Sequence, residues 1–378
     1  MNISLFSFFS GVGMLDLAFE KSGYNIVFVN EYDNQFMNAY KYARKNLHIP
    51  APIYGYFEKS AMYFIKRKGR RKLIELVEKE RKKGNLVGFI GGPPCPDFSK
   101  AGKNRGSEGK HGKLTKTYFD IICKCKPDFF VFENVKGLVQ TNKHKIFYEQ
   151  MKYKIIANGY IFSNKLLNAL SYGVPQFRER EIMIGINATL VEVPCDISVV
   201  NSRFEFEWNR YSFARLETIL NKGWPTIQPF VLNSRRKNKY NIYEELTVEY
   251  WFQKNNVSHH PNARDTFKVK NGRSKIERIA EGDTSRKSFK RLHRWRYSPT
   301  ACYGNNEVHL HPYKARRLSV AEAMAIQSLP KEFVLPKEMT LSSKFKTIGN
   351  GVPYKMSEAI AKTLYEFLKE CKGADKVD

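Results

Sequence analysis

The sequence predicts an α/β fold with a parallel sheet and a second, smaller unit. Short apolar runs at residues 3–9, 26–29 and 86–90 each end in turn-forming residues, and helical stretches separate them. This alternation is typical of parallel sheets. From about Val191 it stops, and aromatic residues interleave with basic ones instead. We therefore expect a sheet-forming part and a region with a different role.

The first two predicted strands end in residues that suit a nucleoside ligand. The first run breaks at Ser10-Gly11-Val12-Gly13, and a helix is expected from Met14 to Lys21. Glycines at such a turn let main-chain N–H groups approach a ligand, and an acid after the second strand can bind a ribose. Glu31 occupies that place. A single Gly-x-Gly can equally be no more than a tight turn.

The strand at 86–90 leads into a rigid loop that carries Cys95. The sequence Gly91-Gly92-Pro93-Pro94 excludes both helix and sheet pairing, so Cys95 is expected at the carboxyl end of the strand. Ligands gather at this edge of open α/β sheets. A lone cysteine is more often a buried structural residue. Beside the polar, glycine-rich flap Lys100–Lys113, however, it suits a nucleophile that acts on an anionic polymer.

Two further segments bring polar side chains towards the same edge. A strand ending at Phe132 delivers Glu133, for which a catalytic role and a structural ion pair both remain open. Before the next predicted strand, Gln176, Arg178 and Arg180 alternate and are expected on one face. They are either surface charges or side chains that converge on a site.

The composition indicates a nucleic-acid partner. The 378 residues include 64 Lys and Arg against 37 Asp and Glu, a formal net charge of +27, which exceeds what solubility requires. The six cysteines are scattered without paired CxxC motifs, so neither a metal site nor a disulfide framework is expected. No apolar run reaches the roughly 18 residues of a membrane span. We expect a cytoplasmic, nucleoid-associated protein without membrane contact.

Basic and aromatic residues are densest at 286–297, within the segment 191–312. This combination suits phosphate contact together with stacking on bases. We interpret 191–312 as a separate domain that faces nucleic acid. Within it, Arg291, Arg294 and Arg296 are expected to contact DNA phosphates.

Taken in order, these pieces resemble the cytosine carbon-5 DNA methyltransferases. The resemblance rests on Phe9-Ser10-Gly11-Val12-Gly13, Glu31, Pro94-Cys95, Glu133-Asn134-Val135, Gln176-x-Arg178-x-Arg180, the helical stretch from Arg316 to Gln327 with its capping box, and Gly349-Asn350-Gly351-Val352-Pro353. It implies a Rossmann-like, class I S-adenosylmethionine-dependent methyltransferase sheet formed by residues 1–190 and 313–378. The segment 191–312 would be a smaller target-recognition domain.

The resemblance also implies S-adenosylmethionine as cofactor and double-stranded DNA as partner. The cofactor contacts that it implies are Phe9, Ser10, Gly11, Gly13, Glu31, Tyr32, Tyr56, Phe57, Pro93, Leu114, Asn350 and Val352. The implied DNA contacts outside the recognition domain are Ser99, Lys103, Arg105 and Gln176. In one departure, Tyr56 stands where many members carry an Asp that binds the adenine amino group.

The expected chemistry is covalent. Cytosine carbon 5 becomes nucleophilic once a thiolate, here from Cys95, adds to carbon 6. Glu133 would bind or protonate ring nitrogen 3, and Arg180 with Arg178 nearby would stabilise the exocyclic oxygen. The base must first leave the duplex.

We expect a DNA cytosine-5 methyltransferase of a bacterial restriction-modification system, with a cognate endonuclease as a candidate partner. An RNA cytosine methyltransferase and a catalytically inactive DNA-binding homologue are the alternatives.

Overall fold

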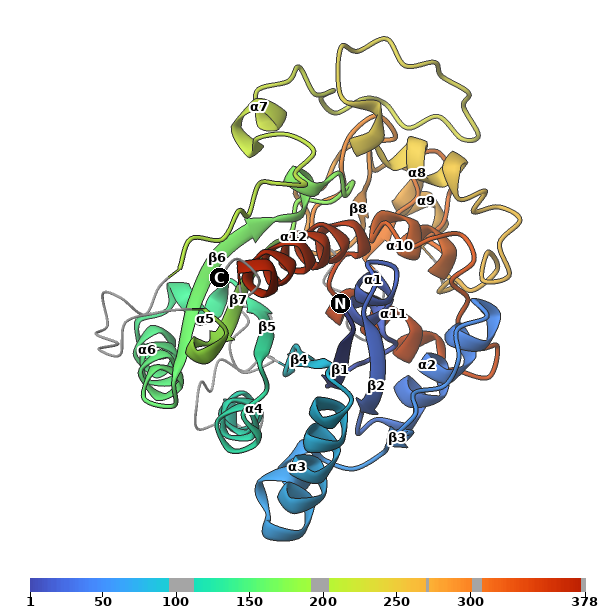
Figure 1. Ribbon diagram of the computed structural model, residues 1–378. Helices are drawn as coiled ribbons and strands as arrows, with labels where there is room; N and C mark the ends of the chain where they lie inside the picture. The colour runs from blue at the N-terminus through green and yellow to red at the C-terminus, as the bar shows by residue number, and fades with distance from the viewer. Residues whose placement is uncertain (95–111, 192–203, 270–271, 301–307, 375–378) are drawn as a thin grey trace.

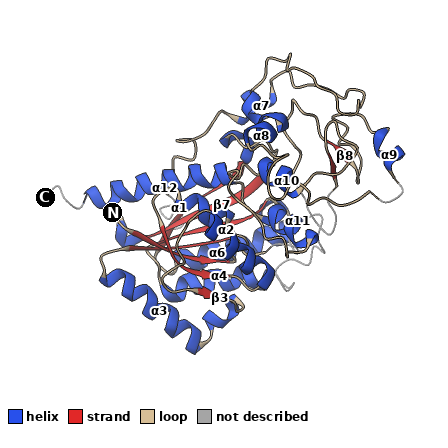
Figure 2. Cartoon of the chain, turned by 90° about the vertical axis from the view of Figure 1, so that its right-hand side faces the viewer, coloured by secondary structure: helices blue, strands red, loops and turns tan. Residues whose placement is uncertain are grey.

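The structure is a computed structural model that describes residues 1–94, 112–191, 204–269, 272–300 and 308–374. Its centre is a seven-stranded sheet with helices on both faces (Figures 1 and 2). The strands are β1 (Ile3–Phe8), β2 (Asn25–Asn30), β3 (Tyr56–Phe57), β4 (Leu86–Gly91), β5 (Phe129–Val135), β6 (Tyr160–Asn168) and β7 (Glu179–Asn187). Their order is β3-β2-β1-β4-β5-β7-β6. The predicted α/β class is confirmed.

Strands β1 to β5 are parallel, as the sequence predicts, but β7 is not parallel to its neighbours. It pairs antiparallel with both β5 and β6. The physical reason is the short connection from β6 to β7, residues 169–178, because a parallel crossover needs a dozen residues or more. The sequence did not predict β6, which is an edge strand with three half-buried or exposed polar residues at its centre, Ser163, Asn164 and Lys165.

Both faces of the sheet are apolar, and helices cover them. In β1, Phe6 and Phe8 point to one face and Ile3 and Leu5 to the other, all buried. The first face packs on η1 (Ala61–Ile65), α3 (Arg67–Lys82), α4 (Gly112–Cys125), α5 (Gly137–Gln140) and α6 (Asn142–Ile156). The second packs on α1 (Met14–Glu20) and α12 (Tyr354–Ala374), with α2 (Asn34–Asn46) and α11 (Leu341–Asn350) beside α1.

Helix α10 (Val320–Ile326) begins as the sequence predicts. The Ser319 hydroxyl accepts a hydrogen bond from the Glu322 N–H, and the Glu322 carboxylate accepts one from the Ser319 N–H. The predicted capping box is confirmed. One side of α10 packs on Trp251 of α8 (Val248–Lys254), and the other packs on α1 and α2. This helix therefore joins the sheet to the region that precedes it in sequence.

Among its described residues, the region between β7 and α10 contains few regular elements. They are η4 (Ala188–Leu190), α7 (Leu216–Leu220), η5 (Glu244–Leu246), α8, α9 (Arg273–Glu277), β8 (Lys290–Arg291) and β9 (His309–Leu310). In both views α7, α8, α9 and β8 gather at the end of the molecule away from α3 (Figures 1 and 2). Within the described ranges, every helix is too short or too polar to cross a membrane.

Candidate active site

The loop after β1 is built around two glycines with left-handed backbone. Gly11 has φ 57° and Gly13 has φ 79°. A Cβ atom on Gly13 would lie 2.5 Å from the ring of Tyr40, so a larger residue does not fit there. Phe9 also has a positive φ, of 54°, which is uncommon for a residue with a side chain and typical of functional sites.

Glu31, at the end of β2, closes this loop from the side. Its carboxylate accepts hydrogen bonds from the N–H groups of Gly11 at 2.8 Å, Tyr32 at 2.8 Å and Asp33 at 2.9 Å. Burial raises the pKa of the Glu31 carboxyl, and these three donors oppose the shift. The structure thus brings together the first glycine turn and the acid that the sequence singled out.

The polar groups of this loop fit a ligand that carries hydroxyl groups. The Ser10 hydroxyl is buried and has no hydrogen-bond partner among the described residues. Tyr32, next to Glu31, is 72% exposed, so its ring is available to a ligand. A buried group that lacks a partner costs free energy, and a nucleoside bound here could satisfy it.

The Gly349–Pro353 turn lies against the same loop. A Cβ atom on Gly351 would lie 2.2 Å from the sulfur of Met14, and one on Gly11 would lie 3.7 Å from the Thr347 hydroxyl. Val352 is buried and Asn350 is exposed. Two further expected cofactor contacts, Pro93 after β4 and Leu114 in α4, are buried and half-buried respectively.

Tyr56 and Phe57 lie on opposite faces of β3. The Tyr56 ring packs on Tyr40 with centroids 5.9 Å apart, whereas the Phe57 ring packs on Tyr63 at 5.5 Å and on Phe64 at 5.1 Å. The Nζ atom of Lys72 lies 5.0 Å from the Phe57 centroid. The two side chains therefore point to opposite faces of the sheet, so a ligand that touches both must lie across the end of β3.

Sequence reasoning missed the charged cluster behind the glycine loop. Arg44 of α2 is buried; its guanidinium donates to the Gly13 carbonyl at 3.1 Å and pairs with Glu20 at 2.9 Å. Tyr40 donates its hydroxyl proton to Asp16 at 2.9 Å. A signal was present, because Tyr40 and Arg44 share the apolar face of α2 four residues apart.

The second cluster pairs Glu133 of β5 with Arg180 of β7. The distance from Glu133 Oε1 to Arg180 Nε is 2.8 Å, and both side chains are buried. Because β7 is antiparallel to β5, its first residues meet the last ones of β5, and Arg180 lies opposite Val135. Burial raises the pKa of the Glu133 carboxyl, and the guanidinium groups of Arg180 and, less strongly, Arg178 oppose the rise.

The loop towards Cys95 leaves β4 beside this ion pair. A Cβ atom on Gly92 would lie 2.6 Å from Glu133 Oε2, so a larger residue there would displace the Glu133 carboxylate. Cys95 itself and the expected DNA contacts Ser99, Lys103 and Arg105 lie outside the described residues. Within the described ranges, no cluster of His, Cys, Asp and Glu could hold a metal ion.

The structure places both Arg178 and Gln176 inside the protein. The Arg178 guanidinium is fully buried and donates to the carbonyls of Gly349 at 2.7 Å and Gly351 at 2.9 Å. It supports the turn after α11, and it lies close enough to Glu133 to help Arg180 lower the pKa of that carboxyl. Gln176 is also fully buried, beside Ser298 in an isolated bridge. Both residues precede β7, so the strand alternation that predicted a common face does not apply to them.

Two of the three arginines expected on DNA phosphates are inside the protein. Arg291 donates to the carbonyls of Ile276, Ile279, His311 and Lys314. Arg294 is bound to Glu281 and Ser234. Guanidinium groups used in this way hold the region together and cannot also reach a phosphate. Arg296 is only half-buried. Composition predicted basic side chains here but could not distinguish buried from exposed ones.

Comparisons with known proteins agree on one family. The family model described as C-5 cytosine-specific DNA methylase matches residues 3–366. The chain is 51% identical over 374 residues to the type II methyltransferase M.NmeDI of Neisseria meningitidis serogroup C, covering 99% of this chain and 86% of the relative. It is 30% identical over 379 residues to M.MthTI of Methanothermobacter thermautotrophicus, covering 98% and 99%.

Solved structures share the fold at low sequence identity. A putative DNA modification methyltransferase encoded within an E. coli prophage aligns with a TM-score of 0.65 and 21% identity, covering 97% of this chain and all of the other. The Dnmt2 methyltransferase of S. pombe aligns with a TM-score of 0.59 and 11% identity, covering 98% and 99%.

Proposed function

The chain belongs to the C-5 cytosine-specific DNA methylase family, and on this premise we propose that Cys95 is the covalent nucleophile that activates a flipped-out cytosine in duplex DNA. The observation that supports this most directly is the buried Glu133–Arg180 pair beside Gly92, three residues before the cysteine. A carboxyl and a guanidinium 2.8 Å apart can bind the ring nitrogen and the exocyclic oxygen of one pyrimidine.

The residues divide the reaction between them. The Cys95 thiolate forms a bond to carbon 6, and Glu133 donates a proton or hydrogen bond to nitrogen 3, where negative charge develops. Burial favours the protonated form of Glu133. Arg180 stabilises the exocyclic oxygen. Once carbon 5 carries the methyl group, its proton would pass to a base such as water, and the electron pair left behind would form the carbon 5–carbon 6 double bond and expel the Cys95 thiolate.

The glycine loop and Glu31 would hold S-adenosylmethionine, which supplies a methyl group on a sulfonium. Glu31 would accept hydrogen bonds from the ribose, and the Ser10 hydroxyl would gain a partner. Phe9, Tyr32 and Val352 would border the cofactor, together with the other expected contacts Gly11, Gly13, Tyr56, Phe57, Pro93, Leu114 and Asn350.

The segment 191–312 would supply target recognition, and the chain would act in the cytoplasm on nucleoid DNA. The named relatives are type II methyltransferases, which supports a cognate restriction endonuclease that acts on the same site. Target sequence and substrate class can be measured together, by bisulfite sequencing of DNA and RNA from a host that expresses the protein. Methylated cytosines confined to RNA would contradict the proposal.

Cys95→Ala is the direct test of the nucleophile. It should abolish methylation and leave duplex binding within about twofold, because the thiol makes the covalent step and not the docking contacts. Duplex DNA with 5-fluorocytosine at the target should trap a denaturation-resistant adduct with the unmodified protein, since fluorine cannot leave as a proton. Continued methylation by Cys95→Ala would refute the assignment.

A further inference from the structure

The segment Ser234–Tyr240 has two different faces. It forms no helix, turn or bend from 234 to 239, and its exposure alternates along the chain. Ser234, Arg236, Asn238 and Tyr240 are half-buried, whereas the residues between them are exposed. This period of two is that of an extended chain with one side held by the protein. In Figure 1 the connection from α7 to α8, which includes this segment, runs across the top of the molecule.

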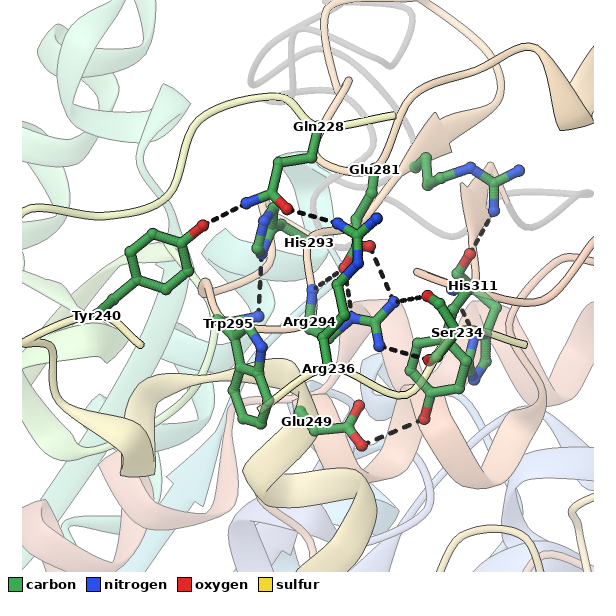
Figure 3. A network of polar contacts seen from close by, with 12 residues as sticks. Gln228, Ser234, Arg236, Tyr240, Glu249, Glu281, His293, Arg294, Trp295 and His311 are labelled. Atoms are coloured by element: carbon green, nitrogen blue, oxygen red, sulfur yellow. Dashed lines mark hydrogen bonds and ion pairs between the residues drawn. The ribbon is translucent and has the colours of Figure 1, made fainter. Parts of the chain in front are cut away.

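The first anchor of the segment is Arg294. Its guanidinium donates to the Ser234 carbonyl and to the Ser234 hydroxyl, both at 2.7 Å. The same group is bound to the Glu281 carboxylate at 2.8 and 3.0 Å, and both side chains of this ion pair are buried (Figure 3). A charged hydrogen bond in such surroundings is among the strong ones, so the position of Ser234 is well defined.

The second anchor is Gln228. Its side-chain oxygen accepts a hydrogen bond from Arg236 at 2.6 Å, and its side-chain nitrogen donates to the Tyr240 hydroxyl. The main chain of Gln228 is paired in both directions with that of Glu281. Figure 3 shows Gln228 between Tyr240 and Arg236, close to the Arg294 anchor. The two anchors are therefore parts of one network.

The remaining inward residue is held separately. Asn238 donates to the Glu244 carboxylate at 2.8 Å. All four half-buried side chains of the segment thus bind the rest of the protein. This arrangement leaves the intervening residues, Arg235, Lys237 and Lys239, as the outward face.

The outward face consists only of cations. Arg235, Lys237 and Lys239 are exposed, and none of the three forms an ion pair with a described residue, although Lys239 lies 6.0 Å from the Tyr240 ring centroid. Alternate residues of an extended chain are about 6.6 Å apart, comparable to the separation of neighbouring phosphates along one nucleic-acid strand. Because the main chain that carries the three cations is already fixed, less conformational entropy is lost when they bind a ligand.

We propose that Arg235, Lys237 and Lys239, the cationic strip, bind successive phosphates of the DNA duplex and set its register on the protein. This inference rests on the proposed function and deepens it by naming the surface that positions the substrate. Phosphate contacts position a duplex without reading its sequence. The strip should therefore govern affinity and salt dependence but not target choice.

The test is the triple variant Arg235→Gln, Lys237→Gln, Lys239→Gln, measured by duplex binding across salt concentrations. Each lost phosphate contact should make the dependence of log affinity on log salt less steep by about 0.9, so the triple variant should change the slope by about 2.7. Between 50 and 200 mM salt, the native protein should then lose about 40-fold more affinity than the variant.

A matched control removes three charges elsewhere. Lys21, Lys79 and Lys82 are exposed and lie at or near the carboxyl ends of α1 and α3, where the chain turns back towards the amino ends of the next strands. Their joint replacement by Gln should leave the slope within about 0.5 of the native value. An equal flattening in the control would overturn the proposal, because it would reveal a general effect of net charge.

Target choice provides the second readout. Bisulfite sequencing should find the triple variant methylating the same sequence as the native protein, more slowly at high salt. A changed target sequence would overturn phosphate contact in favour of base reading, and an unchanged salt slope would place the duplex elsewhere. The salt slope is a binding measurement and does not depend on catalysis. The proposal for the cationic strip can therefore be refuted while the methyltransferase assignment stands, and the methyltransferase assignment can be refuted while the strip still binds DNA.

A variant that keeps every charge tests the anchoring. Gln228→Leu removes the hydrogen bonds to Arg236 and Tyr240 but leaves the Arg294–Glu281 ion pair and all three outward cations. It should weaken duplex binding about three- to tenfold with the cations still present. If this variant bound duplex DNA with native affinity, the hydrogen bonds that fix the main chain would have no role in DNA binding.

Discussion

Replacing Arg178 by Met distinguishes a positioning residue from a catalytic one. Arg178 donates two hydrogen bonds, to the Gly349 and Gly351 carbonyls. Hydrogen bonds from a charged donor contribute about 1.5–3 kcal/mol each, so losing both should lower the free energy of unfolding by about 3 kcal/mol or more. Methionine fills similar space without a donor, which leaves two carbonyls without this partner.

The consequence should appear first in cofactor binding. Asn350 and Val352 belong to the turn that Arg178 supports, and Gly351 packs against Met14 behind the glycine loop. If about half of this loss in stability is also lost from cofactor binding through the turn, the dissociation constant for S-adenosylmethionine should rise at least tenfold. A free-energy difference of about 1.4 kcal/mol corresponds to a factor of ten in that constant. Isothermal titration calorimetry without DNA measures this directly, and urea unfolding measures the stability.

Arg180→Met is the matched control for Arg178→Met. It removes the partner of Glu133 and not the support of the turn, so it should greatly slow methylation while cofactor affinity stays within about threefold of the native value. If Arg178→Met bound cofactor like the native protein and still lost methylation, the positioning role would be refuted. Arg178 would then act in the chemistry, as the sequence predicts.

Two further predictions concern buried ion pairs. Arg180 opposes the burial that raises the Glu133 pKa, and the proposed mechanism uses the protonated form of Glu133. Arg180→Gln should therefore raise this pKa further and move the alkaline loss of the residual kcat/KM to higher pH, whereas an unmoved limb would contradict the role of Glu133 as a proton donor. Arg44→Met should lower the free energy of unfolding by about 3–5 kcal/mol, because it leaves Glu20 buried without its partner. Burial raises the pKa of Glu20 to about 7, and adding Glu20→Gln should recover part of the loss in urea unfolding; no recovery would argue against an uncompensated charge as the cause.

The sequence by itself determined the features that depend only on residues close together along the chain, such as strand ends and helix caps. Apolar runs that end in Gly or an acid mark the strands and place Glu31 and Glu133 at their carboxyl ends, as found. The capping box at Ser319 and Glu322 is equally local and was confirmed. The family also followed from short motifs, because their order along the chain needs no knowledge of the packing.

Only the tertiary structure decided which charged side chains are buried against partners inside the protein and which stay exposed. Arg178 and Arg180 are two residues apart, yet one binds carbonyls after α11 and the other pairs with Glu133 on β5. Arg294 lies inside, and Arg235 in a separate loop lies outside. A guanidinium is stable in either place as long as its donors are satisfied, and the partners that satisfy them come from distant parts of the chain.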